Sequence, residues 1–187
     1  MLGYAFCGSF CTLSKSILAL ERLAAAKKEI QPIISERTYS TDTRFFLAEE
    51  FVRRVEEICG RKAIHTVEDA EPLGPREPLE ALVIAPCTGN TLAKIACGIT
   101  DTAVTMAAKA HLRADRPLLI ALATNDAMSQ NLGNIGRLLT RKSVYFVPMR
   151  QDDVIGKPYS LVAEMDKIPE ALTAMMDGRQ MRPIFVS

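Results

Sequence analysis

Two long apolar runs constrain the fold of this chain more than any other feature of its sequence. Residues 81–85 and 117–123 contain no charged side chain and no alternation of polar and apolar positions. A strand of this kind has no face suited to water, so it belongs inside a sheet that is covered on both faces. Helical patterns follow both runs. Alternating strands and helices predict an α/β fold in which a parallel sheet lies between two layers of helices.

The other segments continue this alternation without an internal repeat or a domain boundary, so we expect a single domain over residues 1–187. Pro32 places its strand near an end or an edge of the sheet. Further strands are expected at 2–6, 30–34, 63–65 and 144–147, and polar loops at 35–43 and 67–78. Helices are expected at 13–24, 45–58, from the turn after residue 85 to Gly98, and at 102–113, 130–140 and 162–176.

The charges of the chain nearly cancel. Lysine and arginine total 23 and aspartate and glutamate total 22, which leaves a net charge of +1. This balance gives no support to nucleic acid or an anionic membrane as a partner. No apolar run approaches the roughly 20 residues that cross a bilayer. The apolar start of the chain lacks the basic region of a secretory signal and is interrupted by Lys15. We therefore expect a cytoplasmic protein.

The five cysteines and two histidines form no metal-binding pattern. No two cysteines make a C-x-x-C pair, and both histidines lie far from them in the sequence. We expect no metal site and reduced, buried thiols. His65 follows an expected strand and is a candidate proton shuttle, although a structural or exposed role is favoured. His111 is expected at the surface, in a charged helix end.

Polar turns follow four of the expected strands. They are Gly8–Ser9, Ser35–Thr38, Pro86–Thr91 and the turn at Asn125. The carboxyl ends of parallel strands meet at one edge of a sheet, where open α/β folds bind their ligands. Helices that start at this edge expose N–H groups that favour anions. The sequence therefore predicts a ligand site at this edge.

Each turn taken alone has a simpler interpretation. Gly8–Ser9 suits a bound phosphate, but it equally suits a tight turn whose serine caps a helix. Asn90 can recognise the polar edge of a ligand, or it can cap the next helix, a role that Thr88 fills equally well. Lys94, one turn further on, either faces the ligand or is solvated. The chain has neither a G-x-G-x-x-G nor a P-loop pattern, so neither nucleotide-binding motif is supported.

Residues 85–96 resemble the P-A-S-A-N-T turn of the flavin-containing cysteine decarboxylase superfamily. They are also similar to the P-C-S turn of the related flavin prenyltransferases. The resemblance implies a Rossmann-like, flavodoxin-type parallel sheet that binds FMN. It also implies a homo-oligomer built from trimers, with FMN at an interface between copies.

Six motifs in the same order along the chain resemble the B subunits of dipicolinate synthase, a family within this flavoprotein superfamily. The motifs are residues 8–12, 43–45, 70–75, 85–90, 106–110 and 124–127. The resemblance implies an oxidoreductase component that helps to form dipicolinate from a hydroxytetrahydrodipicolinate or dihydrodipicolinate intermediate of the lysine pathway. It implies the cytoplasm of the mother cell of a sporulating bacterium. The implied partners are a small dicarboxylate substrate and the A subunit of dipicolinate synthase, through which NAD(P) would act.

The resemblance also assigns residues to the implied site. Asn90 would be the catalytic residue. The cofactor would contact Gly8, Ser9, Phe10, Ser35, Pro86, Cys87, Thr88, Gly89, Asn90 and Thr91. The substrate would contact Asn125 and Met128, which match two positions of the P-x-M-N-x-x-M-W motif of the decarboxylases, and Arg44 and Lys109 are candidates for its two carboxylates.

The departures from the decarboxylases change the expected chemistry. Leu122, Thr124 and Ser129 replace three residues of their substrate motif, and their catalytic histidine is missing near Pro72–Leu73. Without that base, decarboxylation of a cysteine is poorly supported. Three hypotheses stay open: a flavin-type component of dipicolinate synthase, a non-catalytic partner of the A subunit, and, with least support, a cysteine decarboxylase.

Overall fold

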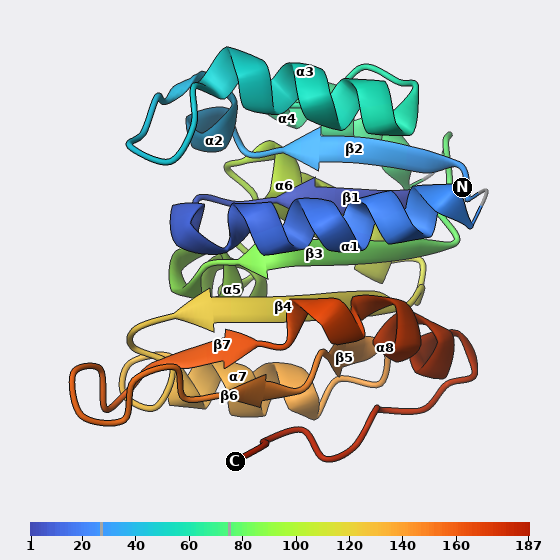
Figure 1. Cartoon of the computed structure of the whole chain (residues 1–187). Helices are drawn as coiled ribbons and strands as arrows, with labels where there is room; N and C mark the ends of the chain where they lie inside the picture. The colour runs from blue at the N-terminus through green and yellow to red at the C-terminus, as the bar shows by residue number, and fades with distance from the viewer. Residues whose placement is uncertain (27, 75) are drawn as a thin grey trace.

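The computed structural model describes residues 1–26, 28–74 and 76–187, and a mostly parallel sheet lies at its centre (Figure 1). The strand order is β2-β1-β3-β4-β7-β6, and β5 also pairs with β4. Strands β1 to β5 run parallel, whereas β7 is antiparallel to both β4 and β6. The strands are β1 (Leu2–Phe6), β2 (Ile30–Ile34), β3 (Ala81–Cys87), β4 (Leu118–Thr124), β5 (Val144–Phe146), β6 (Met149–Arg150) and β7 (Leu161–Ala163).

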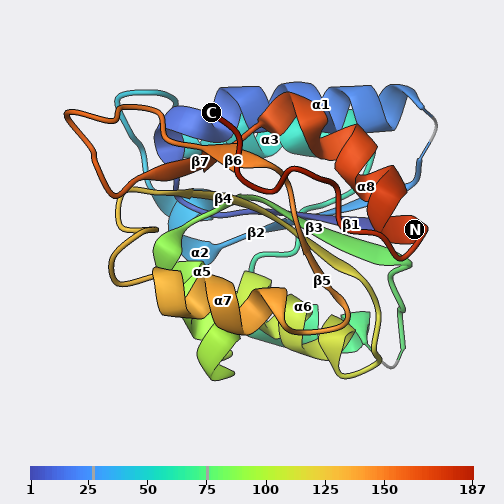
Figure 2. The ribbon, with the colours of Figure 1, turned by 90° about the horizontal axis from the view of Figure 1, so that it is seen from below.

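Helices cover both faces of the sheet, as Figure 2 shows. One face carries α1 (Leu13–Ala25), α3 (Ala48–Cys59) and α8 (Ile168–Met176), and the other carries α5 (Gly89–Cys97), α6 (Ala103–Leu112) and α7 (Leu132–Leu139). The short helices are α2 (Glu36–Ser40) and α4 (Val67–Ala70), with 3-10 turns at Phe10–Thr12, Glu71–Leu73 and Met165–Lys167. This arrangement confirms the predicted three-layer αβα fold. In the described part of the chain, no helix is long and apolar enough to cross a bilayer.

The two central strands are apolar at nearly every position because both of their faces are buried. In β3, Val83 and Ala85 pack into the core beneath α1 and α8. Leu82 and Ile84 point the other way, into the core beneath α5, α6 and α7. All seven residues of β3 are buried. The prediction of a fully buried strand at 81–85 is therefore confirmed, and the edge position of β2 confirms the interpretation of Pro32.

Four predicted segments differ from the structure. The expected strand at 63–65 is a single bridge between Ile64 and Ile33. The expected loop at 35–43 contains α2, because the Ser35 hydroxyl accepts a hydrogen bond from the Thr38 N–H and caps a helix. Thr66 caps α4 in the same way within the expected loop at 67–78.

The fourth difference concerns the predicted closing helix at 162–176. Its first residues form β7, and the helix α8 begins only at Ile168, where Pro169 occupies its first turn. An apolar stretch of this length fits either a strand or a helix by composition alone. The backbone pairing of β7 with β4 and β6 decides in favour of the strand and makes this end of the sheet antiparallel.

His111 is fully buried, so the expectation that it lies at the surface is wrong. Its ring Nε2 lies 2.8 Å from the Pro117 carbonyl oxygen. The chain after α4 lies so close to α6 that a Cβ atom on Gly74 would be 2.8 Å from the Ala110 oxygen. This cover lies over the part of the helix next to His111. Burial lowers the pKa of His111 below its usual value, against the smaller raising effect of the Pro117 hydrogen bond.

We predict that His111 makes the fold less stable in mild acid. The folded state disfavours the charged ring, so the unfolded chain binds the proton more readily. The free energy of unfolding should be flat above about pH 6.5, the usual histidine value, and fall below it by up to about 1.4 kcal/mol per pH unit. Urea unfolding of His111→Gln, which keeps a donor for Pro117, should lose this slope, whereas His65→Gln should keep it. Equal pH profiles for wild type and His111→Gln would contradict the assignment.

Candidate functional site

The turns after the parallel strands meet at one edge of the sheet. The Cys7 N–H donates to the Pro86 oxygen at 3.2 Å, and the Ser35 N–H donates to the Phe6 oxygen at 3.0 Å. These bonds place the turns after β1, β2 and β3 side by side. The convergence predicted from the sequence is therefore confirmed, and it lies at the left of Figure 1.

Four hydroxyl groups surround the first of these turns. The Thr12 hydroxyl donates to the Ser9 backbone oxygen at 2.8 Å and to the Ser9 hydroxyl at 3.1 Å. The hydroxyls of Ser35 and Thr38 lie 2.9 Å apart. A Cβ atom on Gly8 would be only 3.7 Å from the Thr38 hydroxyl, so the two pairs flank this glycine. We call these four residues the hydroxyl cluster. Thr12 and Thr38 are buried, so the partly exposed hydroxyls of Ser9 and Ser35 are the ones that could reach a phosphate group.

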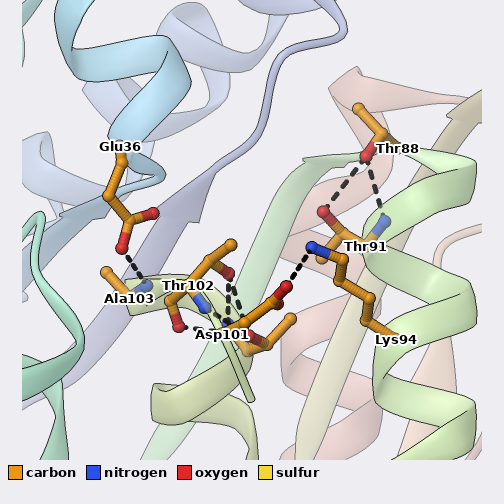
Figure 3. A network of polar contacts seen from close by, with 8 residues as sticks. Glu36, Thr88, Thr91, Lys94, Asp101, Thr102 and Ala103 are labelled. Atoms are coloured by element: carbon orange, nitrogen blue, oxygen red, sulfur yellow. Dashed lines mark hydrogen bonds and ion pairs between the residues drawn. The ribbon is translucent and has the colours of Figure 1, made fainter. Parts of the chain in front are cut away.

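The turn after β3 shows which residue caps α5. The Thr88 hydroxyl accepts a hydrogen bond from the Thr91 N–H at 3.2 Å and donates to the Thr91 hydroxyl at 3.1 Å (Figure 3). Thr91 in turn donates to the Cys7 sulfur at 3.3 Å. Thr88 therefore caps α5, in agreement with the interpretation that leaves Asn90 without a capping role. The Asn90 side chain is exposed and makes no hydrogen bond within the described residues, so it is free to contact a ligand.

The thiols at the strand ends, Cys7 and Cys87, are buried as expected, whereas Cys11 and Cys97 are exposed, so the expectation of buried thiols is wrong for those two. Burial raises the pKa of Cys7 to about 11 and that of Cys87 well above its usual value. Pro86 and Cys87 are both buried within the end of β3. Pro86 and Cys87 therefore support the turn from inside the sheet, and their side chains are not exposed at its surface. Neither thiol is a nucleophile at neutral pH.

A polar cluster that the sequence did not reveal fixes the start of α5 against β4. The Asp126 carboxylate accepts hydrogen bonds from the Thr124 hydroxyl at 2.5 Å and from the Asn131 amide at 3.0 Å. A Cβ atom on Gly89 would lie 2.5 Å from the Thr124 hydroxyl and 2.6 Å from the Asn131 nitrogen. The cluster therefore occupies the space that a side chain at position 89 would fill. The contact joins residues far apart in the sequence, so no local pattern predicts it.

Two further contacts join helix starts near this edge, as Figure 3 shows. The Glu36 carboxylate accepts a hydrogen bond from the Ala103 N–H, the first of α6, at 2.8 Å. Lys94 forms an ion pair with Asp101 at 2.8 Å, and this hydrogen bond lowers the pKa of the Asp101 carboxyl. The Lys94 ammonium is therefore held by Asp101 rather than left for a ligand.

The structure brings three of the four substrate candidates to this edge. Arg44 is exposed in the loop between α2 and α3, and its guanidinium lies 4.8 Å from the Phe45 ring centre. This loop reaches the first turn through Phe46, whose ring centre is 5.8 Å from that of Phe10.

Asn125 and Met128 lie in the turn after β4. Asn125 is exposed, and the Met128 N–H donates to the Tyr159 oxygen at 2.9 Å. Lys109 is different: it lies on the outer side of α6, beside Arg113 and Arg141 around a cavity of about 120 Å³. The structure does not bring Lys109 together with the other candidates.

His65 lies next to the turn after β2, because the preceding residue, Ile64, pairs with Ile33 near the carboxyl end of that strand. His65 stacks on Tyr39, with ring centres 3.7 Å apart, beside a groove of about 800 Å³ along α3. Pro72–Leu73 lie in a 3-10 turn and carry no titratable side chain. Within the described ranges, no group of three histidine, cysteine or acidic residues has the arrangement of a metal site.

This fold, with polar turns gathered at the strand ends, matches a family of known proteins. The sequence profile of the Flavoprotein family matches residues 2–176, so the chain belongs to the flavoprotein family. Among individual proteins, it is 40% identical over 185 residues to the B subunit of dipicolinate synthase from Bacillus subtilis (strain 168). The match covers 99% of this chain and 92% of that relative.

Solved structures agree with this assignment. The B subunit of dipicolinate synthase from Bacillus halodurans C superposes with a TM-score of 0.91 at 37% identity, covering 100% of this chain and 95% of the other. A dodecameric FMN-dependent Ubix-like decarboxylase from Escherichia coli O157:H7 has a TM-score of 0.66 at 17% identity, covering 97% of this chain and 95% of the other. The second likeness shows that the fold is shared.

We predict that Gly89→Ala destabilises the protein by about 1–3 kcal/mol, because the new methyl group must displace the Thr124–Asp126–Asn131 cluster. Gly136→Ala is the matched control: it lies inside α7 with nothing within 4 Å of an added Cβ. That change should stabilise the fold by up to about 1 kcal/mol. Urea unfolding measures the stability of both variants. A Gly89→Ala protein as stable as wild type would contradict the prediction, because the cluster would then move aside at no cost in free energy.

Proposed function

We propose that this chain works as the B subunit of a dipicolinate synthase and carries its ligand site at the converging turns of the sheet. The observation that supports this most is the 40% identity to the Bacillus subtilis protein over nearly the whole chain. The six ordered motifs include the turns at this edge. Identity at this level over 99% of the chain favours a shared role over a shared fold alone.

We propose FMN as the bound cofactor. The residues present fit it: the hydroxyl cluster around Gly8 suits the phosphate, and the exposed Asn90 offers both a donor and an acceptor for the polar edge of the flavin ring. The first backbone N–H groups of α5 add a partial positive charge beside Asn90. When bound, FMN supplies an acceptor for two electrons and a proton.

The proposed substrate is a small dicarboxylate, a hydroxytetrahydrodipicolinate or its dehydrated form. Conversion to dipicolinate requires loss of one water from the hydroxylated ring, followed by loss of two electrons and two protons to an acceptor. Arg44 is one cation in this edge region that suits a substrate carboxylate, and Asn125 and Met128 border the same region. Asn90 would orient the ring against the cofactor.

A second candidate function is a non-catalytic partner of a nicotinamide-dependent A subunit. One observation favours it: the turns after β1, β3 and β4 contain no histidine that could act as a base. His111 is buried beside Pro117 at the start of β4, and His65 is stacked on Tyr39. Asn90 and Asn125 are also exposed, which fits completion of the site by another chain, whether the A subunit or a second copy in a trimer-based homo-oligomer.

We predict that purified protein takes up FMN, seen as a visible flavin spectrum and a saturable titration. Ser9→Ala should weaken FMN binding about tenfold or more, since a hydrogen bond to a charged phosphate is lost. Its binding of riboflavin, which has no phosphate, should not change. Ser40→Ala is the matched control, because that exposed hydroxyl donates only to the Glu36 oxygen. A wild-type protein that binds neither flavin would overturn the cofactor assignment.

The two candidate functions differ in their response to Asn90. Dipicolinate formation is measured with the A subunit on its own, with added wild-type protein, and with Asn90→Ala. If this chain is catalytic, Asn90→Ala should lower the rate about 100-fold while its melting temperature stays unchanged, because the side chain makes no internal hydrogen bond within the described residues. A full rate without this chain, or with the variant, would favour the non-catalytic role.

A further inference from the structure

A small cavity on the outer side of α6 lies apart from the converging turns. Its volume is about 120 Å³, and it is lined by the end of α5, by α6 and by a residue that follows α7. Figure 2 shows α5, α6 and α7 together on this face of the molecule. The cavity shares no lining residue with the turns after β1, β2, β3 and β4. Pockets for drug-sized ligands measure roughly 300–1,000 Å³, so this cavity suits a ligand with a single ring.

Three cations line this cavity, and none of them has an ion-pair partner within the described residues. They are Lys109 and Arg113 on one side of α6 and Arg141 after the end of α7. Lys109 and Arg113 are four residues apart, so their side chains are neighbours on the helix surface. Like charges at this spacing repel each other and destabilise a helix. A bound anion removes this repulsion.

The segment that forms the cavity is basic, although the net charge of the whole chain is only +1. Residues 94–142 contain seven lysine and arginine residues but three acidic residues, and no acidic residue lines the cavity. The three acids, Asp101, Asp115 and Asp126, are each held by another side chain. The described part of this segment therefore offers the cavity cations no carboxylate, and an external anion is the partner that suits them.

The buried part of the cavity lining is apolar, whereas the exposed part is charged. Ile95, Ala108 and Leu112 line the cavity with buried side chains. Thr100 also lines it, and its hydroxyl makes no hydrogen bond in the part of the chain that the structure describes. An inorganic anion gains nothing from apolar side chains, whereas a flat ring is stabilised against them. Cations on two different elements suit a ligand with two carboxylates.

We propose that this cavity is a second ligand site, which binds a small planar dicarboxylate such as pyridine-2,6-dicarboxylate. The ring lies against the apolar lining, one carboxylate meets Lys109 and Arg113, and the other meets Arg141. The class of ligand follows from the cavity alone. The particular compound is dipicolinate, the product of the reaction, so that choice rests on the proposed function. The site is separate from the proposed substrate site, because Arg44 does not line the cavity.

The test is calorimetric titration of the purified chain with pyridine-2,6-dicarboxylate, in buffer free of divalent metal ions because the probe chelates them. Wild type should bind the probe. Lys109→Gln/Arg113→Gln and Arg141→Gln should each weaken binding about tenfold or more, because charge-assisted hydrogen bonds are lost. Pyridine-2-carboxylate, which has one carboxylate, should bind wild type about tenfold more weakly than the probe for the same reason.

Lys15→Gln/Arg22→Gln is the matched control, because it neutralises one exposed lysine and one exposed arginine on α1, on the other face of the sheet. It should bind the probe as wild type does, and equal melting temperatures show that each variant is folded. Arg44→Gln, at the proposed substrate site, should also keep a bound probe. A complex with the A subunit that forms no dipicolinate would refute the proposed function and leave this binding result intact.

Four results overturn the inference. The first is wild-type protein that does not bind the probe, and the second is inorganic phosphate that binds as tightly as the probe does. The third is loss of all probe binding in Arg44→Gln, which would place the dicarboxylate at the edge of the sheet alone. The fourth is a Lys109→Gln/Arg113→Gln variant that binds the probe normally but loses association with the A subunit, which would make this face a protein contact.

Discussion

The absence of a water-compatible face on β3 and β4 is the constraint on which the rest of the structure depends. Both strands are buried on both sides, so helices must cover each face of the sheet. Each crossing returns the chain to the same end of the next parallel strand. The turns that follow the parallel strands therefore gather at the carboxyl edge, where we propose the ligand site.

At the helix starts along this edge, some side chains cap the helix and others make no hydrogen bond within the described part of the chain. Thr88 satisfies the Thr91 N–H, and Ser35 satisfies the Thr38 N–H, so these hydroxyls are partly occupied within the chain. Asn90 is the residue that this arrangement leaves free. Because Thr88 caps the helix, the Asn90 amide in the first turn of α5 is not needed as a cap. Asn90 is therefore a better candidate for contact with a ligand than the threonines around it.

The sequence predicted the elements whose signals are local and left out those that depend on distant contacts. The strand at 81–85 follows from its composition, and the edge position of Pro32 from its missing donor. The Asp126 cluster could not be predicted, since it depends on Gly89, whose missing side chain matters only once β4 lies beside it. The prediction that His111 lies at the surface was wrong for a related reason. Its charged neighbours in the sequence suggested an exposed position, but the chain near Gly74 covers the helix.

The α1 helix connects the carboxyl edge of the sheet to a groove of about 360 Å³ that its side chains line. The α1 helix starts beside Ser9, at the edge where the ligand is proposed to bind, and its side forms one wall of the groove. Its buried face is held in the core by residues such as Leu20, so the helix is a rigid connection between the two surfaces.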